Sequence, residues 1–161
     1  MWIAICRPKS EKEFSFNSLK QNNKLIKKNW SASLVDLGDG VAGLEFHSVL
    51  KAELNPIDGS IMQSILNAVT WVKDNGFNGL VISGDSTNFS AGANLNMILD
   101  FAEKKDYDSL ENVINLMQGL MQELRFAPFP VIAAPFGLVL GGGFETIGAC
   151  DRIVASAESY I

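Results

Sequence analysis

The chain has 161 residues, of which 47% are hydrophobic and 19% are charged, and its formal net charge at pH 7 is −5. This size and composition are typical of one globular domain with an apolar core and exclude disorder over most of the chain. The sequence has no run of 18 apolar residues, and its apolar start, residues 1–6, is too short for a secretory signal. We therefore expect a cytoplasmic protein without a membrane span.

The charge is unevenly distributed along the chain. Residues 1–30 contain seven basic and two acidic residues, a net charge of +5, whereas the remainder carries −10. This shift predicts a basic linker-like segment over residues 1–32, followed by a folded domain over residues 33–161. Because the basic residues fall in the expected linker and the domain is acidic, strong nucleic-acid binding is not expected.

Cysteine and histidine are scarce. Cys6 and Cys150 are the two cysteines and lack Cys-x-x-Cys spacing, so we expect free thiols in a reducing compartment. His47 is the sole histidine, and no clustered Asp, Glu or Cys accompanies it in the sequence. No metal site is therefore predicted, and we expect a structural role for His47.

The first predicted elements after the linker are two strands and a helix. Residues 34–37 and 41–46 flank Gly-Asp-Gly, which is typical of a β-hairpin. Apolar residues then recur at helical spacing from Ile57 to Val72, and a glycine at position 76 predicts the end of that helix.

The second half of the chain continues this alternation. A buried strand is predicted at residues 79–82, and an apolar helical stripe over residues 113–124 precedes a strand at residues 131–134. A short helix starting at Gly142 leads to a further strand at residues 152–155. Repeated strand, helix, strand units predict an α/β fold around a parallel sheet, with the 113–124 stripe in its core.

Three adjacent glycines followed by a glutamate are the most informative feature, in the sequence Gly-Gly-Gly-Phe-Glu at residues 141–145. Glycines leave backbone N–H groups unshielded, and at a helix start these groups attract negative charge. Such a run also commonly makes a turn or lets a helix pack closely on a strand. The functional interpretation gains weight from a second small-residue loop around residues 90–94, because two such loops can converge on one oxygen as an oxyanion hole.

The two loops together resemble the enoyl-CoA hydratase/isomerase (crotonase) superfamily. The shared residues are Ser-Gly at 83–84, Phe-Ser-Ala-Gly-Ala-Asn-Leu at 89–95 and Ala-Pro-Phe-Gly-Leu-Val-Leu-Gly-Gly-Gly-Phe-Glu at 134–145. The chain departs from the superfamily at Asn94, where Asp is usual, and at Pro135 and Phe136. The resemblance implies a spiral of ββα units, incomplete here because the C-terminal helices are absent.

Residues 33–47 resemble, more narrowly, the hydratase part of multifunctional fatty acid oxidation proteins that also carry a 3-hydroxyacyl-CoA dehydrogenase. This resemblance implies an acyl-CoA thioester as substrate in fatty acid β-oxidation. It implies no covalently bound cofactor, with CoA entering as part of the substrate and NAD required only if a dehydrogenase domain is attached. The expected partners are further copies of the chain in a homo-oligomer, or the attached dehydrogenase domain.

The resemblance also assigns roles to individual residues. Glu145 occupies the position of the catalytic glutamate that orients and deprotonates water, and the N–H groups of Ala93 and Gly142 occupy those of the oxyanion hole. Asp151 is expected to be structural. The expected substrate-binding residues are Lys51, Ala52, Leu54, Ala91, Gly92, Asn94, Leu95, Asn96 and Gly141.

One expected catalytic group has no counterpart in the sequence. Hydratases of this kind use a second glutamate to protonate the α-carbon, and the resemblance places it beyond residue 161, because Glu158 comes too early. We therefore expect a fragment of a larger hydratase. The alternatives are a non-catalytic acyl-CoA-binding or interaction remnant that keeps the oxyanion loops, and an enoyl-CoA isomerase on the same fold.

Overall fold

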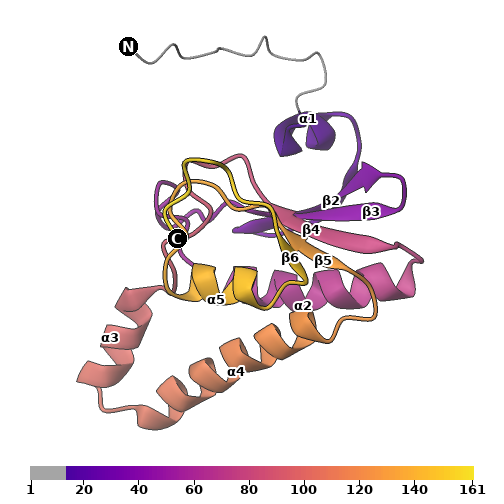
Figure 1. The fold of residues 1–161 in the computed structure, drawn as a ribbon. Helices are drawn as coiled ribbons and strands as arrows, with labels where there is room; N and C mark the ends of the chain where they lie inside the picture. The colour runs from indigo at the N-terminus through magenta and orange to yellow at the C-terminus, as the bar shows by residue number, and fades with distance from the viewer. Residues whose placement is uncertain (1–13) are drawn as a thin grey trace, which may run out of the picture.

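The computed structural model describes residues 14–161, which form one six-stranded sheet with five helices in the described part of the chain (Figure 1). The strands lie in the sheet in their order along the chain. They are β1 Leu25–Lys28, β2 Ala32–Gly38, β3 Val41–Phe46, β4 Gly79–Ser83, β5 Val131–Ala133 and β6 Arg152–Ile153. The helices are α1 Phe16–Gln21, α2 Gly59–Asp74, α3 Leu95–Glu103, α4 Tyr107–Arg125 and α5 Gly142–Gly148.

The sheet is antiparallel at its N-terminal edge and parallel beyond. β2 and β3 form the predicted hairpin, whose turn places Gly38, Asp39 and Gly40 at positive φ. From β3 onward every pair is parallel, and each crossover contains one or two helices. The predicted α/β fold class is confirmed. The strands and helices predicted after residue 33 occur in the predicted order, with α3 as a further helix between β4 and α4.

The apolar core lies between the sheet and α2. Asp58 caps α2 by accepting a hydrogen bond from the Ile61 N–H, and the helix then buries Ile61, Ile65 and Val72 completely. Fewer residues of α4 are buried in the core than the apolar stripe over residues 113–124 predicts. On that helix, Leu120 and Leu124 alone are fully buried. No helix within residues 14–161 is long and apolar enough to cross a membrane.

Part of the segment that was predicted to be a linker forms a helix and a strand, α1 and β1. β1 pairs antiparallel with β2, and α1 lies on the opposite face of the sheet from α2 in Figure 1. Phe16 of α1 is buried, and a side chain at Gly43 of β3 would come within 3.0 Å of its ring. Residues 16–28 of the predicted linker therefore pack against the domain, held by the buried Phe16 and by the pairing of β1 with β2. Residues 1–13 of the predicted linker lie outside the described residues.

A buried ion pair also holds α1 against the sheet. The Lys20 Nζ lies 2.8 Å from the Glu45 Oε2, and the Glu45 side chain is only 2% exposed. We expect Lys20→Met to lower the free energy of unfolding by about 3 kcal/mol, because it leaves a buried carboxylate without its counter-charge. Lys24→Met is the matched control, since the Lys24–Asp36 pair is far more exposed and contributes at most about 1 kcal/mol. Equal losses for the two variants in chemical denaturation would contradict this assignment.

Candidate functional site

Two loops that are distant in the sequence lie side by side at the carboxyl ends of β4 and β5. We call residues 86–94 the first oxyanion loop and residues 134–141 the second. The Phe89 N–H donates to the Phe136 carbonyl at 2.9 Å, and the Ser90 carbonyl accepts from the Leu140 N–H at 3.0 Å. This short parallel ladder holds the two predicted halves of the oxyanion hole together.

The glycines of these loops permit an approach that a side chain would prevent. Gly92 has a φ of +100°, and a Cβ there would lie 2.8 Å from the Leu140 carbonyl oxygen. A Cβ on Gly143 would lie 2.7 Å from the Ser90 carbonyl oxygen. The close packing of a helix, which was the other interpretation of the glycine run, is therefore observed, and it brings the start of α5 against the first oxyanion loop.

Ala93 and Gly142 meet where the two loops converge. A Cβ built on Gly142 would lie 3.5 Å from the Ala93 nitrogen, so the two residues border the same small space. Within residues 14–161, neither the Ala93 N–H nor the Gly142 N–H has a hydrogen-bond acceptor. Two adjacent and unpaired backbone donors of this kind are suited to binding one oxygen atom.

Glu145 opens into an apolar cavity of about 440 Å³ between α2, α3, α4 and α5, and Ala93 lies in the same wall. The lining is made mostly of Met and branched aliphatic side chains. It comprises Ile57, Met62, Ala93, Met97, Ile98, Val113, Ile114, Met117, Gln118, Met121, Gln122 and Glu145. The apolar stripe over residues 113–124 is predicted to lie in the core, but one side of it lines this cavity. The spacing of apolar residues is the same for a helix face that lines an apolar cavity and for one that packs in the core.

A second cavity of about 390 Å³ adjoins the first at Ala93. Seven of the residues predicted to bind substrate line it: Lys51, Leu54, Ala91, Gly92, Asn94, Leu95 and Asn96. Ala52 is exposed in the turn next to Lys51 and is not in the lining. Gly141 lies at the junction of the loops, where its Cβ position is 3.9 Å from the Gly92 Cα. Ala93 thus lies between a cavity whose lining includes Lys51 and two asparagines and a more apolar cavity that includes Glu145.

Asn55 is a buried residue beside the first oxyanion loop that the sequence analysis did not assign a role. Its Oδ1 accepts from the Ser48 N–H at 2.7 Å, and its Nδ2 donates to the Phe89 carbonyl at 2.8 Å. It adopts a φ of +48°, which asparagine tolerates better than most residues. The only signal in the sequence is an Asn before Pro56 in a loop, which is common in ordinary turns as well.

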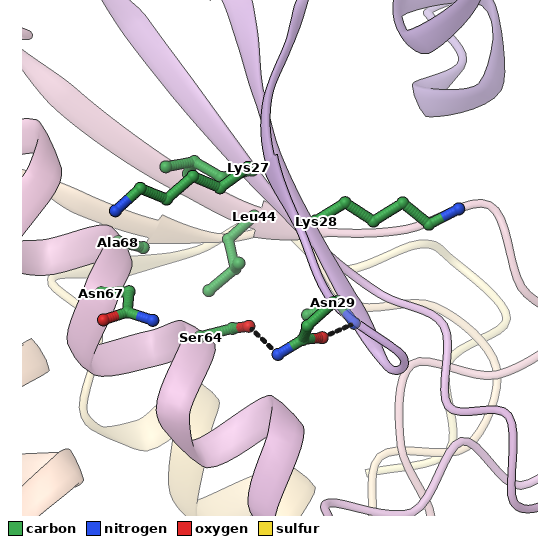
Figure 2. A pocket seen from close by; sticks show the side chains of 9 residues that line it. Lys27, Lys28, Asn29, Leu44, Ser64, Asn67 and Ala68 are labelled. Atoms are coloured by element: carbon green, nitrogen blue, oxygen red, sulfur yellow. Dashed lines mark hydrogen bonds between the residues drawn. The ribbon is translucent and has the colours of Figure 1, made fainter.

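A third cavity, of about 320 Å³, lies between β1 and α2, away from the two loops (Figure 2). Lys27 extends toward α2 in this view, whereas Lys28 points to the other side of the strand. The Asn29 amide donates to the Ser64 Oγ at 2.9 Å. The residues that line this cavity include no carboxylate, imidazole or thiol, and their ionisable groups are the ammonium groups of Lys27 and Lys28.

The remaining candidate groups have structural surroundings. The His47 Nε2 lies 2.7 Å from the Ser33 Oγ, and the Asp151 carboxylate accepts from the Val131 N–H, in line with the expected structural roles. Burial, with a smaller effect of Asp151, raises the pKa of the Cys150 thiol to about 12, which keeps it protonated and a poor nucleophile. Cys6 lies outside the described residues. Within residues 14–161, no three His, Cys, Asp or Glu side chains cluster as metal ligands.

The chain is similar to known proteins in both sequence and fold. Residues 38–161 match the family model of enoyl-CoA hydratase/isomerase. The chain belongs to the enoyl-CoA hydratase/isomerase family. A solved enoyl-CoA hydratase from Shewanella pealeana is 27% identical, with a TM-score of 0.69 over 78% of this chain and 46% of that one. Another from Thermoplasma volcanium is 24% identical, with a TM-score of 0.71 over 81% of this chain and 50% of that one. The predicted crotonase-type α/β fold is confirmed.

Two curated family relatives are much longer than this chain. A Bacillus subtilis protein named "Probable 3-hydroxyacyl-CoA dehydrogenase" is 40% identical over 152 residues, 94% of this chain and 19% of that protein. A Rickettsia prowazekii protein, provisionally named as a fatty acid oxidation complex trifunctional enzyme, is 31% identical over 146 residues, 89% and 19% of the two chains. The chain therefore spans 19% of the length of each of these relatives.

Proposed function

We propose that the protein carrying this chain hydrates 2-enoyl-CoA thioesters, with Glu145 as the base and the N–H groups of Ala93 and Gly142 as the oxyanion hole. The observation that carries the proposal is the place of Ala93. It lies where the cavity that contains Lys51 and the apolar cavity meet, next to Gly142, and in the same wall as Glu145.

The two cavities suit the two ends of an acyl-CoA. The apolar cavity matches a fatty acyl chain, because Met and branched aliphatic side chains bury hydrocarbon without demanding hydrogen bonds. The other cavity holds Lys51, Asn94 and Asn96, whose polar groups suit the CoA portion. The thioester then falls at Ala93, between the two unpaired N–H groups.

Negative charge on the thioester oxygen is what the two N–H groups would stabilise. When the oxygen of water bonds to the β-carbon, the electrons of the double bond shift and the thioester becomes an enolate. Donors that are held in place before the reaction stabilise this charge without having to reorganise. The ladder between the oxyanion loops holds both donors in place.

Glu145 supplies the proton transfer in this proposal. Its carboxylate takes one proton from the attacking water, while the hydroxyl oxygen forms the new bond to the β-carbon. The second glutamate, which the resemblance places beyond residue 161, gives a proton to the α-carbon. Glu145 returns its proton to that residue through solvent, and the net change is addition of H and OH across the double bond. The side chain is exposed to the cavity rather than engaged by a described hydrogen-bond partner, so it is free to meet that water.

The longer relatives support a wider context for this reaction. We infer that the chain is the hydratase part of a multifunctional fatty acid β-oxidation protein that also carries an NAD-dependent 3-hydroxyacyl-CoA dehydrogenase. The names and lengths of the two curated relatives favour this context. Assembly into a homo-oligomer is part of the same proposal.

Purified full-length protein tests the proposed function. Incubation with a 2-enoyl-CoA is expected to remove the absorbance of the conjugated thioester and to yield 3-hydroxyacyl-CoA, identified by chromatography and mass. Tight acyl-CoA binding without turnover would replace the proposal with the binding remnant. Conversion of a 3-enoyl-CoA to the 2-enoyl isomer, without hydration, would replace it with an isomerase.

A further inference from the structure

We propose that Asn88 is a positioning residue that sets the geometry of the oxyanion hole by tying three loops together with one side chain. The inference rests on the proposed function, because it concerns the placement of the Ala93 and Gly142 N–H groups. Asn88 does not line either cavity near Ala93, so it acts through the loops rather than on the substrate.

The oxygen of the Asn88 side chain holds the second oxyanion loop. The Oδ1 accepts a hydrogen bond from the Leu138 N–H at 2.8 Å. The backbone passes so close that a Cβ on Gly137 would lie 2.5 Å from this oxygen and 2.7 Å from the Thr87 carbonyl. Gly137 also has a φ of +57°, so this close approach requires glycine for two reasons.

This contact adds a side-chain hydrogen bond to the backbone hydrogen bonds that join the two oxyanion loops. On one side of it the Phe89 N–H donates to the Phe136 carbonyl, and on the other the Ser90 N–H donates to the Leu138 carbonyl at 3.0 Å. The Leu138 N–H faces Asn88 between these two bonds, and the side chain supplies the acceptor for it. Asn88 therefore helps fix the register that brings Gly142 opposite Ala93.

The nitrogen of the same amide holds a third loop. The Nδ2 donates to the Glu53 carbonyl at 2.6 Å, within the segment that borders the cavity containing Lys51. Two backbone bonds continue this alignment: the Ala91 N–H donates to Leu54 and the Ile57 N–H donates to Gly92, both at 2.8 Å. The first oxyanion loop is thus held on one side by residues 53–57 and on the other by the second loop.

Asparagine is one of few side chains that can make both contacts. Its short, planar amide presents an acceptor and a donor from the same carbon, whereas aspartate offers acceptors alone and alanine offers neither. Asn88→Asp therefore keeps the bond to Leu138 but loses the bond to Glu53, and Asn88→Ala loses both. The pair separates the oxyanion contact from the contact with the CoA-side segment.

Steady-state hydration kinetics of the full-length protein give the first readout. We expect Asn88→Ala to lower kcat roughly 10- to 100-fold, because small misplacements at a reacting centre reduce rates to this extent. Asn88→Asp is expected to retain most of kcat and to raise KM roughly 3- to 10-fold, the effect of one lost hydrogen bond. Asn67→Ala, an exposed asparagine on α2, is the control and should change neither quantity.

Amide hydrogen exchange gives a second readout that needs no turnover. Exchange at Leu138 and Leu140 is expected to accelerate in Asn88→Ala but not in Asn88→Asp, with the amides of β4 as an internal reference. If the unchanged protein does not hydrate enoyl-CoA, the proposed function fails, and exchange still decides the role of Asn88. If Asn88→Ala does not fold, Asn88→Leu takes its place in the comparison, because leucine keeps a similar side-chain volume but offers neither the acceptor nor the donor.

Two results would overturn the inference. One is an equal loss of kcat in the alanine and aspartate variants, which would show that the acceptor for Leu138 does not matter. The other is unchanged exchange at Leu138 in a folded Asn88→Ala variant, which would show that the loops hold their register without this side chain.

Discussion

Replacing Glu145 with glutamine is expected to reduce hydration of 2-enoyl-CoA by about 100- to 10,000-fold, the usual contribution of a general base. The amide has the shape of the carboxylate but cannot accept the proton of the attacking water. Because the Glu145 side chain is exposed to the cavity, the substitution should leave both the fold and acyl-CoA binding intact. kcat of the full-length variant measures the loss, and titration with a saturated acyl-CoA measures binding.

Glu111→Gln is the matched control for this experiment. Glu111 is exposed on α4 and is not among the residues that line the apolar cavity, so the same chemical change there should not alter kcat. Near-normal turnover by Glu145→Gln would refute the assignment of the base. A parallel loss of acyl-CoA binding would instead indicate a binding role for Glu145.

Adding a methyl group at Gly142 is expected to lower kcat by about 100- to 1000-fold, as the loss of one oxyanion donor does. In Gly142→Ala the new carbon would lie 3.5 Å from the Ala93 nitrogen, in the space assigned to the thioester oxygen. Its other near neighbours are the ends of two side chains, Met117 at 3.2 Å and Ile57 at 3.5 Å, and Gly142 is not at positive φ. The variant should therefore fold, and its defect should lie in catalysis.

Gly148→Ala provides the control on the same helix. A Cβ at Gly148 meets nothing within 4 Å, so this variant should retain full activity. The carbonyl stretching frequency of a bound, unreactive acyl-CoA thioester adds a direct measurement of the oxyanion hole. Gly142→Ala should shift that frequency toward its value in solution, and an unshifted frequency with normal kcat would exclude Gly142 from the oxyanion hole.

The strands and helices after residue 33 were predictable because local patterns determine them. The Gly-Asp-Gly turn requires positive φ and leads directly to the hairpin of β2 and β3. The helical spacing from Ile57 to Val72 appears in the structure as α2, with its apolar positions buried. Both features depend on residues within a few positions of one another, and the sequence displays such relations directly.

The predictions for residues 16–28 and for the helix over 113–124 were less accurate. In the first segment, the basic charge favoured a linker, but Phe16 and Lys20 of α1 both contact β3, Phe16 at Gly43 and Lys20 at Glu45. On the second, Met117 and Met121 line a cavity although their spacing is that of core residues. Composition and periodicity report which residues are apolar or charged, but not which neighbour they meet.

The sequence alone was sufficient to establish the family, the order of strands and helices, and the two glycine-rich loops with Glu145 after the second. The tertiary structure decided the rest. The approach of Ala93 to Gly142, the cavity wall that Ala93 shares with Glu145, and the three loops joined by Asn88 all connect residues about 35 to 50 positions apart. Such contacts arise because parallel strands bring the loops at their carboxyl ends together, and strand pairing is a property of the whole fold rather than of any local segment.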